Sequence, residues 1–343
     1  MTLRLGILGA GWFGREAHLK NLLHMPDVIV TAASSRSEES QQAARDLGGS
    51  ELRVFADWHD VLQERSLDAV IVALPNIDHH QAALAALTAG KHVLCEKPLG
   101  LSIVECDELI DVADRSGLVL QVGHEMRHQR LYQRMKSLVD EGGVGEPRLM
   151  WCREYRGPMR PGWRSSPERT GGMLLEKNCH HFDLFNWIFD AVPQRVTAFG
   201  GTDVLTDQDI LDNAQVLVEY DGGRRAVLEI CLFTPSGGDC EIGVVGTEGR
   251  IDTWNQAIRL VHHRFDPQDT KEERVPDPDE AGFTDASGRV DRGIKAQLEH
   301  FLHCCRTGDR PLNDGRSARR NVSVCLAAQR AITSGNVEPV SVH

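Results

Sequence analysis

The stretch LRLGILGAGWFG, Leu3 to Gly14, decides the fold of the first part of the chain. The run Leu3–Leu8 is almost wholly apolar, which predicts a short buried strand. Gly9, Gly11 and Gly14 follow in a G-x-G-x-x-G pattern that opens a helical pattern. The first glycine permits a tight turn, the second lets the backbone approach a pyrophosphate, and the third allows helix and strand to pack closely. In this context the motif predicts a dinucleotide bound at the N-terminus of the helix.

The first 123 residues alternate short apolar runs with helix-forming segments. Apolar runs predict strands at Val28–Ala33, Ala69–Leu74, His92–Cys95 and Val119–Val122. Apolar residues spaced by three and four predict helices at Gln41–Leu47, Gln81–Ala89 and Val104–Arg115. This alternation predicts an N-terminal Rossmann domain, residues 1–123, with a doubly wound parallel sheet.

The pattern changes after Gly123, where we expect a second domain over residues 124–343. A helical stretch, residues 132–141, comes first, and a region rich in Arg, Gly and Pro follows. Strands separated by turns are then predicted at residues 214–220, 226–232, 240–245 and 250–254, which favours an antiparallel sheet. Residues 262–291 are charged and predict loop or edge strand, and residues 293–306 predict an amphipathic helix.

Composition excludes several classes of protein. The chain carries 38 Lys and Arg against 50 Asp and Glu, a net charge of -12, and has no long basic run, so nucleic acid is not an expected partner. No apolar stretch approaches the roughly 20 residues of a membrane span, and the start runs into a strand rather than a signal sequence; we expect a cytoplasmic protein. The nine cysteines include no C-x-x-C pair, which indicates reduced thiols and predicts no metal site.

The end of the second predicted strand bears on the choice of dinucleotide. NAD enzymes usually place an acidic residue there for the ribose 2'-hydroxyl, and that carboxylate would repel a 2'-phosphate. Here the strand runs into Ser34, Ser35 and Arg36, whose donors and positive charge suit the phosphate. Glu38 and Glu39 come slightly later and start the next helix, where acidic residues are favoured. The sequence therefore favours NADP, with NAD possible.

Glu96, Lys97 and Pro98 stand at the end of the strand around Val93. In open parallel sheets the ligand binds beyond the carboxyl ends of the strands, so this tripeptide is expected near the nicotinamide. By itself a lysine before a proline is more often a solvated turn residue. We expect the dinucleotide to contact residues of the four segments that follow these strands, namely Gly9, Gly11, Trp12, Phe13, Gly14, Ser34, Ser35, Arg36, Pro75, Asn76, His79, Glu96 and Lys97.

Together these motifs resemble one family over nearly the whole chain. The glycine fingerprint, the P-N-x-x-H run Pro75–His79 and the G-K-H-V run leading into E-K-P resemble the glucose-fructose oxidoreductase, inositol dehydrogenase and rhizopine catabolism family, Gfo/Idh/MocA. In the second half, Gly171-Gly172, the pair Glu176 and His180, and Asp183 are similar to its active-site helix. Residues 245–249, V-G-T-E-G, are similar to its sheet turn.

This resemblance implies an NAD(P)-dependent oxidoreductase with a C-terminal α/β domain whose large open, mainly antiparallel sheet commonly forms subunit contacts. A homodimer or homotetramer is therefore expected. It also implies that Lys97 hydrogen-bonds the reacting oxygen and that His180 takes its proton as an alcohol is oxidised. Physical chemistry supports both roles: an imidazole accepts a proton near neutral pH, and an ammonium stabilises developing negative charge.

The remaining candidates divide by role. Glu176 is four residues before His180, hence on the same helix face, and could orient it or bind a substrate hydroxyl; many relatives have Asp there. Asp183 is equally open to a structural reading, and His79 either lines the cofactor groove or caps the following helix. An aromatic and guanidinium-rich loop is our candidate substrate wall, with a salt-bridged lid as the alternative. Its members are Tyr155, Arg156, Arg160, Trp163 and Arg164, with Arg127 as a weaker candidate.

Three functions fit these features. The first is a dehydrogenase acting on a secondary hydroxyl of a sugar, an inositol-like cyclitol or a glycoside. Its catalytic residues would be Lys97, His180 and Glu176. The residues expected to contact its substrate are Arg127, Tyr155, Trp163, Arg164, Glu176 and His180. The second is an NADPH-dependent reductase of a keto-sugar or dicarbonyl. The third is a non-catalytic dinucleotide-binding sensor or subunit, which would not need a proton acceptor such as His180.

Overall fold

The computed structural model describes residues 2–158, 162–235, 240–277, 283–284 and 290–342. The chain folds into two compact units, residues 1–125 with 294–319 and residues 126–293 with 320–343. The sequence predicts a single division at residue 123. Residues 294–319, which that division assigns to the second domain, fold with the first unit instead.

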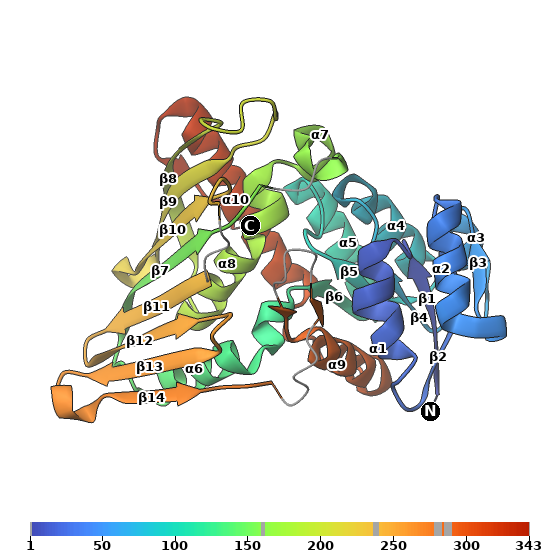
Figure 1. Cartoon of the computed structure of the whole chain (residues 1–343), viewed down its shortest axis with the longest axis horizontal. Helices are drawn as coiled ribbons and strands as arrows, with labels where there is room; N and C mark the ends of the chain where they lie inside the picture. Colours follow the sequence, from blue (N-terminus) through green and yellow to red (C-terminus); the bar gives the residue numbers. More distant parts are fainter. Residues whose placement is uncertain (1, 159–161, 236–239, 278–282, 285–289, 343) are drawn as a thin grey trace. The chain divides into compact units, whose positions relative to one another are not determined.

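The first unit is built on a six-stranded parallel sheet (Figure 1). Its strand order is β3-β2-β1-β4-β5-β6, the doubly wound order in which the chain changes direction between β1 and β4. The sheet therefore confirms the predicted Rossmann topology. The short strand β3 was not expected from the sequence. The strands are β1 (Leu3–Leu8), β2 (Val28–Ser34), β3 (Arg53–Phe55), β4 (Ala69–Val72), β5 (His92–Glu96) and β6 (Leu120–Gly123).

Helices connect these strands, and local signals set their ends. In α5 the hydroxyl of Ser102 accepts a hydrogen bond from the backbone N–H of Glu105, and Gly117 ends the helix in the left-handed conformation, φ 62°. The helices α4 and α5 lie side by side (Figure 1). The helical segments of this unit include η1 (Gly14–Leu19), α1 (Lys20–Leu22), α2 (Glu38–Gly48), α3 (Trp58–Leu62), α4 (Asn76–Thr88), α5 (Ile103–Ser116) and α9 (Ile294–Thr307).

The second unit contains a nine-stranded sheet in the order β14-β13-β12-β11-β7-β10-β9-β8-β17. Only the β7–β10 pair is parallel among these neighbours, so the sheet is mainly antiparallel, as predicted. Its strands are β7 (Pro147–Tyr155), β8 (Pro193–Gly201), β9 (Asn213–Tyr220), β10 (Arg225–Cys231), β11 (Cys240–Gly246), β12 (Gly249–Trp254), β13 (Arg259–Arg264), β14 (Lys271–Arg274) and β17 (Glu338–Pro339). A separate two-stranded pair joins β15 (Phe283–Thr284) to β16 (Val290–Asp291).

The helices of the second unit are α6 (Arg130–Asp140), α7 (Pro167–Thr170), α8 (Met173–Phe189) and most of α10 (Gly315–Ser334), whose first residues belong to the first unit. Helix α8 is buried along most of its length and contacts β7. None of the helices in the part of the chain that the structure describes is long and apolar enough to span a membrane.

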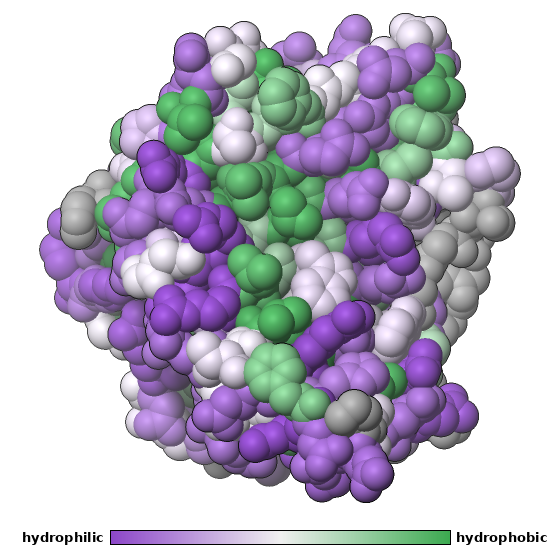
Figure 2. Space-filling view, turned by 90° about the vertical axis from the view of Figure 1, so that its left-hand side faces the viewer, coloured by the Kyte–Doolittle hydropathy of each residue, from purple (hydrophilic) through white to green (hydrophobic). Residues whose placement is uncertain are grey.

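Strand β7 shows how the two faces of the large sheet differ. Cys152 and Glu154 are buried, and they point to the face that α8 covers, where His181 contacts Glu154. The alternate residues point to the other face, because side chains alternate along a strand. That open face carries a group of apolar side chains (Figure 2). By the strand register, the exposed residues Leu149, Phe199, Leu217 and Val227 all lie on this face.

Candidate functional site

The backbone of the glycine turn after β1 agrees with the roles expected of Gly9, Gly11 and Gly14. Gly9 has φ 103°, in the region that favours glycine, and a Cβ there would overlap the backbone of Ala73. A Cβ on Gly14 would overlap the carbonyl oxygen of Gly9, so the helix approaches the strand closely only without one. A Cβ on Gly11 would meet nothing within 4 Å, which leaves its backbone open to a ligand.

The segment after β2 divides between the turn and the solvent. Ser34 is buried, its hydroxyl oxygen lies 3.3 Å from the backbone N of Gly9, and its carbonyl accepts from the N–H of Ala10 at 2.6 Å. Ser34 thus supports the glycine turn through its hydroxyl and its carbonyl, both of which accept hydrogen bonds from that turn. Arg36 has an exposed guanidinium, 3.5 Å from the carboxylate of Asp78. The exposed Arg36, unlike the buried Ser34, can therefore reach a ligand.

Glu96 and Lys97 take different positions at the carboxyl end of β5. The carboxylate of Glu96 is buried and lies 2.8 Å from Nε2 of His18, on η1. Gly123 on β6 leaves the room that this carboxylate occupies, since a Cβ there would lie 2.6 Å from Oε2. Glu96 therefore ties the first helix to the sheet, and Lys97 is the half-buried residue that follows the strand. The partner His18 was not found by the sequence reasoning.

His79 connects two turns at the same edge of the sheet. Its ring nitrogens Nδ1 and Nε2 lie 2.7 Å from the carbonyl oxygen of Pro98 and 2.8 Å from that of Leu74. The ring is buried, and this burial lowers the pKa of His79. The ring thus forms a bridge that holds the backbone directly after Lys97, and the lining of the cofactor groove by His79 stays a prediction.

Helix α8 of the second unit carries the other half of the predicted machinery. His180 is half-buried, and Glu176, one turn earlier, is buried. The carboxylate oxygen Oε1 of Glu176 lies 3.3 Å from Nε of Arg164, whose guanidinium lies 4.6 Å from the centre of the Trp163 ring. The structure thus brings Glu176, Arg164 and Trp163 together. The ion pair between Arg164 and Glu176 also fits the alternative of a salt-bridged lid. Arg160, another predicted member of the wall, lies outside the described residues.

Tyr155 does not join this group. It lies on the open face of the sheet, one position after Glu154, which points toward α8. Its hydroxyl donates to Oε1 of Glu229 on β10 at 2.6 Å. Placing Tyr155 in the substrate wall was therefore wrong, because strand alternation sends its side chain to the face opposite α8.

Arg127 and Asp183 form a buried ion pair, and this corrects the expectation for Arg127. Nε and Nη2 of Arg127 donate to the two carboxylate oxygens of Asp183, each at 2.6 Å. The amide of Asn321 on α10 donates to the same carboxylate at 2.7 Å. Arg127 is 4% and Asp183 0% exposed, so neither faces a substrate. Asp183 takes the structural role, and Arg127 is its partner rather than a wall residue.

Removing Arg127 should destabilise the second unit. We expect Arg127→Ala to lower the free energy of unfolding by about 3–5 kcal/mol, because it leaves the carboxylate of Asp183 buried without its cation. Urea unfolding followed by tryptophan fluorescence measures this change. The matched control, Arg148→Ala, removes an exposed pair with Glu146 and should cost no more than about 1 kcal/mol. Equal losses in the two variants would show that the buried pair contributes nothing special.

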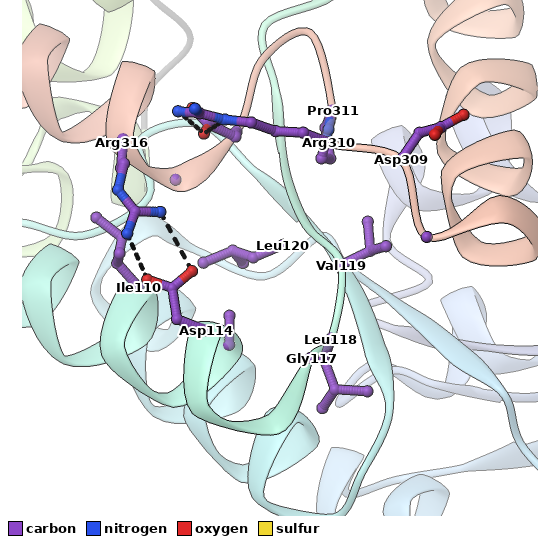
Figure 3. A pocket seen from close by; sticks show the side chains of 14 residues that line it. Ile110, Asp114, Gly117, Leu118, Val119, Leu120, Asp309, Arg310, Pro311 and Arg316 are labelled. Atoms are coloured by element: carbon purple, nitrogen blue, oxygen red, sulfur yellow. Dashed lines mark hydrogen bonds and ion pairs between the residues drawn. The ribbon is translucent and has the colours of Figure 1, made fainter.

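The first unit also has a cavity of about 280 Å³ between the end of α5 and residues 308–316 (Figure 3). Leu120, the first residue of β6, lines it, so the cavity lies at the amino end of that strand and away from the glycine turn. Arg316 and Asp114 face each other across it in an ion pair (Figure 3). This cavity contains none of the predicted site residues.

Comparison with known proteins places the chain. Residues 3–124 match the model of an oxidoreductase family with an NAD-binding Rossmann fold, GFO_IDH_MocA, and residues 136–342 match the model of that family's C-terminal alpha/beta domain. The chain belongs to this family. It is therefore an oxidoreductase with an NAD-binding Rossmann domain, and the resemblance seen in the sequence is confirmed.

The similarity to several known proteins covers nearly the full length of this chain. An inositol 2-dehydrogenase/D-chiro-inositol 3-dehydrogenase of Lactiplantibacillus plantarum is 29% identical over 96% of this chain and 90% of its own. A scyllo-inositol 2-dehydrogenase (NAD(+)) of Bacillus subtilis is 26% identical over 97% of this chain and 95% of its own. The structure of a levoglucosan dehydrogenase in complex with NADH shares the fold, with a TM-score of 0.86 at 19% identity over 99% of this chain and 100% of that one.

Proposed function

We propose that this enzyme transfers a hydride between a nicotinamide dinucleotide and a secondary hydroxyl of a cyclitol, sugar or glycoside. The observation that carries the proposal is the position of Lys97, directly after β5 at the carboxyl edge of a sheet whose β1 turn has the dinucleotide glycine geometry. The relatives that act on inositols support the substrate class.

The proposed chemistry uses one group from each unit. Lys97 donates a hydrogen bond to the reacting oxygen and stabilises its negative charge, and His180 accepts the hydroxyl proton. A nicotinamide held beyond the glycine turn would supply the hydride acceptor, its C4 atom. Glu96 and His79 act as positioning residues, since one anchors the strand end before Lys97 and the other holds the carbonyl of Pro98 after it.

Glu176 and Arg164 are proposed to contact the hydroxyl groups of the substrate that do not react. The carboxylate accepts hydrogen bonds and the guanidinium donates them, so the pair can address adjacent hydroxyls of a polyol. Trp163, which stacks on Arg164, supplies the apolar face that sugar rings favour. Reduction of a keto-sugar is the same chemistry in reverse, with protonated His180 as the acid.

We propose NADP as the preferred cofactor, on the strength of Arg36. Replacement of Arg36 by alanine should weaken NADP binding by about tenfold and leave NAD binding within about twofold, since one exposed charge-assisted bond to a phosphate is lost. Titration of tryptophan fluorescence with each nucleotide measures both affinities. Arg45→Ala, which removes an exposed arginine of α2, is the control. An equal loss for both nucleotides would refute a 2'-phosphate role.

We also propose a homo-oligomer formed through the open face of the large sheet. Exposed Phe199, Leu217 and Val227 offer apolar surface there, and such surface marks protein contacts. Light scattering after gel filtration should give a dimer or tetramer for the wild type, and Phe199→Asp should shift it toward the monomer. A monomeric wild type would refute the proposal.

The test of the proposed function is a substrate panel read by the absorbance of reduced nicotinamide. The panel contains cyclitols, aldoses and glycosides, with simple aliphatic alcohols and 2-hydroxy acids as controls, each offered with NAD and with NADP. We expect turnover with members of the polyol group and at most weak turnover with the controls. No turnover with any polyol, in either direction of the reaction, would contradict the proposed substrate class.

A further inference from the structure

Four buried side chains of the second unit meet between the large sheet and α8. None of them has a role in the proposed function. Cys152 and Glu154 come from β7, Cys240 from β11 and His181 from α8. Cys240 is directly opposite Glu154 in the β7–β11 pairing, and Cys152 lies two positions along the same face. Their exposures are 1% for Cys152, 1% for Glu154, 0% for Cys240 and 2% for His181.

The ligand atoms of Cys152, Cys240 and His181 all lie within 4.8 Å of one another, close enough to share one tetrahedral ion. Sγ of Cys152 lies 3.9 Å from Sγ of Cys240, and that sulfur lies 3.5 Å from Nε2 of His181. The same Nε2 lies 3.6 Å from Oε2 of Glu154. Zinc bonds of about 2.3 Å to sulfur and about 2.0 Å to nitrogen, set at the tetrahedral angle, give ligand separations of about 3.8 Å for two sulfurs and about 3.5 Å for sulfur and nitrogen.

We propose that Cys152, Cys240 and His181 bind a zinc ion, and that the carboxylate of Glu154, which contacts His181 but lies outside this group of three, turns toward the ion as the fourth ligand. Two thiolates, an imidazole and a carboxylate form a donor set that zinc accepts in proteins. Both thiols release their protons to solvent when the ion binds. Four protein ligands leave no open position for water or substrate, so this zinc is structural and takes no part in the hydride transfer.

The groups around the four ligands suit a metal as well. Lys177 Nζ and Arg156 Nη1 each lie 3.6 Å from Oε1 of Glu154, and their charges offset the negative charge of the loaded site. The amide of Asn178 lies 3.2 Å from Nδ1 of His181. With its oxygen turned toward the ring, that amide accepts the Nδ1 proton and leaves Nε2 to the metal.

The site joins three elements that are distant in sequence. It links the central strands β7 and β11 to α8 at the residue next to His180. We therefore expect the ion to fix the part of α8 that presents His180, so its loss should loosen that helix before it affects the sheet.

Metal analysis of the purified full-length protein tests the proposal. Protein produced in zinc-supplemented medium and purified without chelator should contain about one zinc per chain by plasma mass spectrometry. Cys240→Ser and Cys152→Ser should each retain less than about a tenth of that amount, because a hydroxyl is a poor zinc ligand. Cys231→Ser, which removes a half-buried thiol of β10 outside the group, should keep the full amount.

Cobalt provides a measurement that needs no variant. Protein produced with Co²⁺ in place of zinc should show the strong visible bands of a tetrahedral ion and the near-ultraviolet charge-transfer bands of two thiolate ligands. Wild-type protein that is folded but free of metal would overturn the proposal. So would a disulfide between Cys152 and Cys240, detected as the loss of two of nine titratable thiols, and so would full zinc content in a folded Cys240→Ser variant.

Discussion

Replacing Lys97 with alanine should lower turnover by about 10³-fold on the best substrate of the panel, because the reacting oxygen loses the cation that stabilises its developing charge. The affinity for the dinucleotide should stay within about threefold, since the glycine turn and Arg36 are untouched and lie on other loops. Steady-state rates and fluorescence titration of the nucleotide measure the two effects on the same preparation.

A matched control separates this role from a general effect of charge. Lys20→Ala removes an exposed lysine of α1 in the same unit and should leave both rate and affinity unchanged. Lys97→Arg keeps the charge but not the shape of the donor, and we expect it to recover only a small part of the rate. Wild-type turnover in Lys97→Ala would show that the role assigned to this lysine is wrong.

Replacing His180 with alanine should lower the rate of alcohol oxidation by about 10²–10⁴-fold, the range that a positioned general base contributes. The wild-type rate should also rise with pH over an acidic limb, because the base must be unprotonated to accept the hydroxyl proton. The variant should lack that limb. Profiles of kcat/KM against pH for both proteins measure this difference.

Two further variants test whether the loss of rate is specific to His180. His303→Ala, which removes an exposed histidine of α9, should keep both the rate and the profile of the wild type. Glu176→Gln should raise KM more than it lowers kcat if its carboxylate binds substrate hydroxyls. A His180→Ala variant with the acidic limb intact would assign the proton transfer to another group.

The sheet of the first unit was predictable because its signals are local. An apolar run followed by G-x-G-x-x-G fixes β1 and the start of η1 within a few residues. Strand β7 was missed, since its sequence mixes exposed Arg148 and Arg153 with buried Cys152 and its ends lie in a polar region. Residues 294–319 fold with the first unit because they contact residues that are distant in sequence. The spacing of apolar residues does not report such contacts.

The candidate site was predictable only where a motif names a residue. Lys97 and His180 stand in motifs, but the partner of Glu96 is His18, 78 residues earlier. Likewise Arg127 finds Asp183 56 residues later, which converts a candidate substrate residue into part of the core. The expectation of no metal site rested on the absence of C-x-x-C. Cys152 and Cys240 meet only because β7 and β11 are neighbours in the sheet.

The central claim is that Lys97 and His180 act on one oxygen of the substrate, and a crystal structure of the enzyme with dinucleotide and a polyol of the panel tests it most directly. The account predicts that Nζ of Lys97 and a ring nitrogen of His180 both lie about 2.6–3.2 Å from the same hydroxyl oxygen, on the carbon that faces C4 of the nicotinamide. A bound polyol whose reacting hydroxyl touches neither side chain would contradict the account.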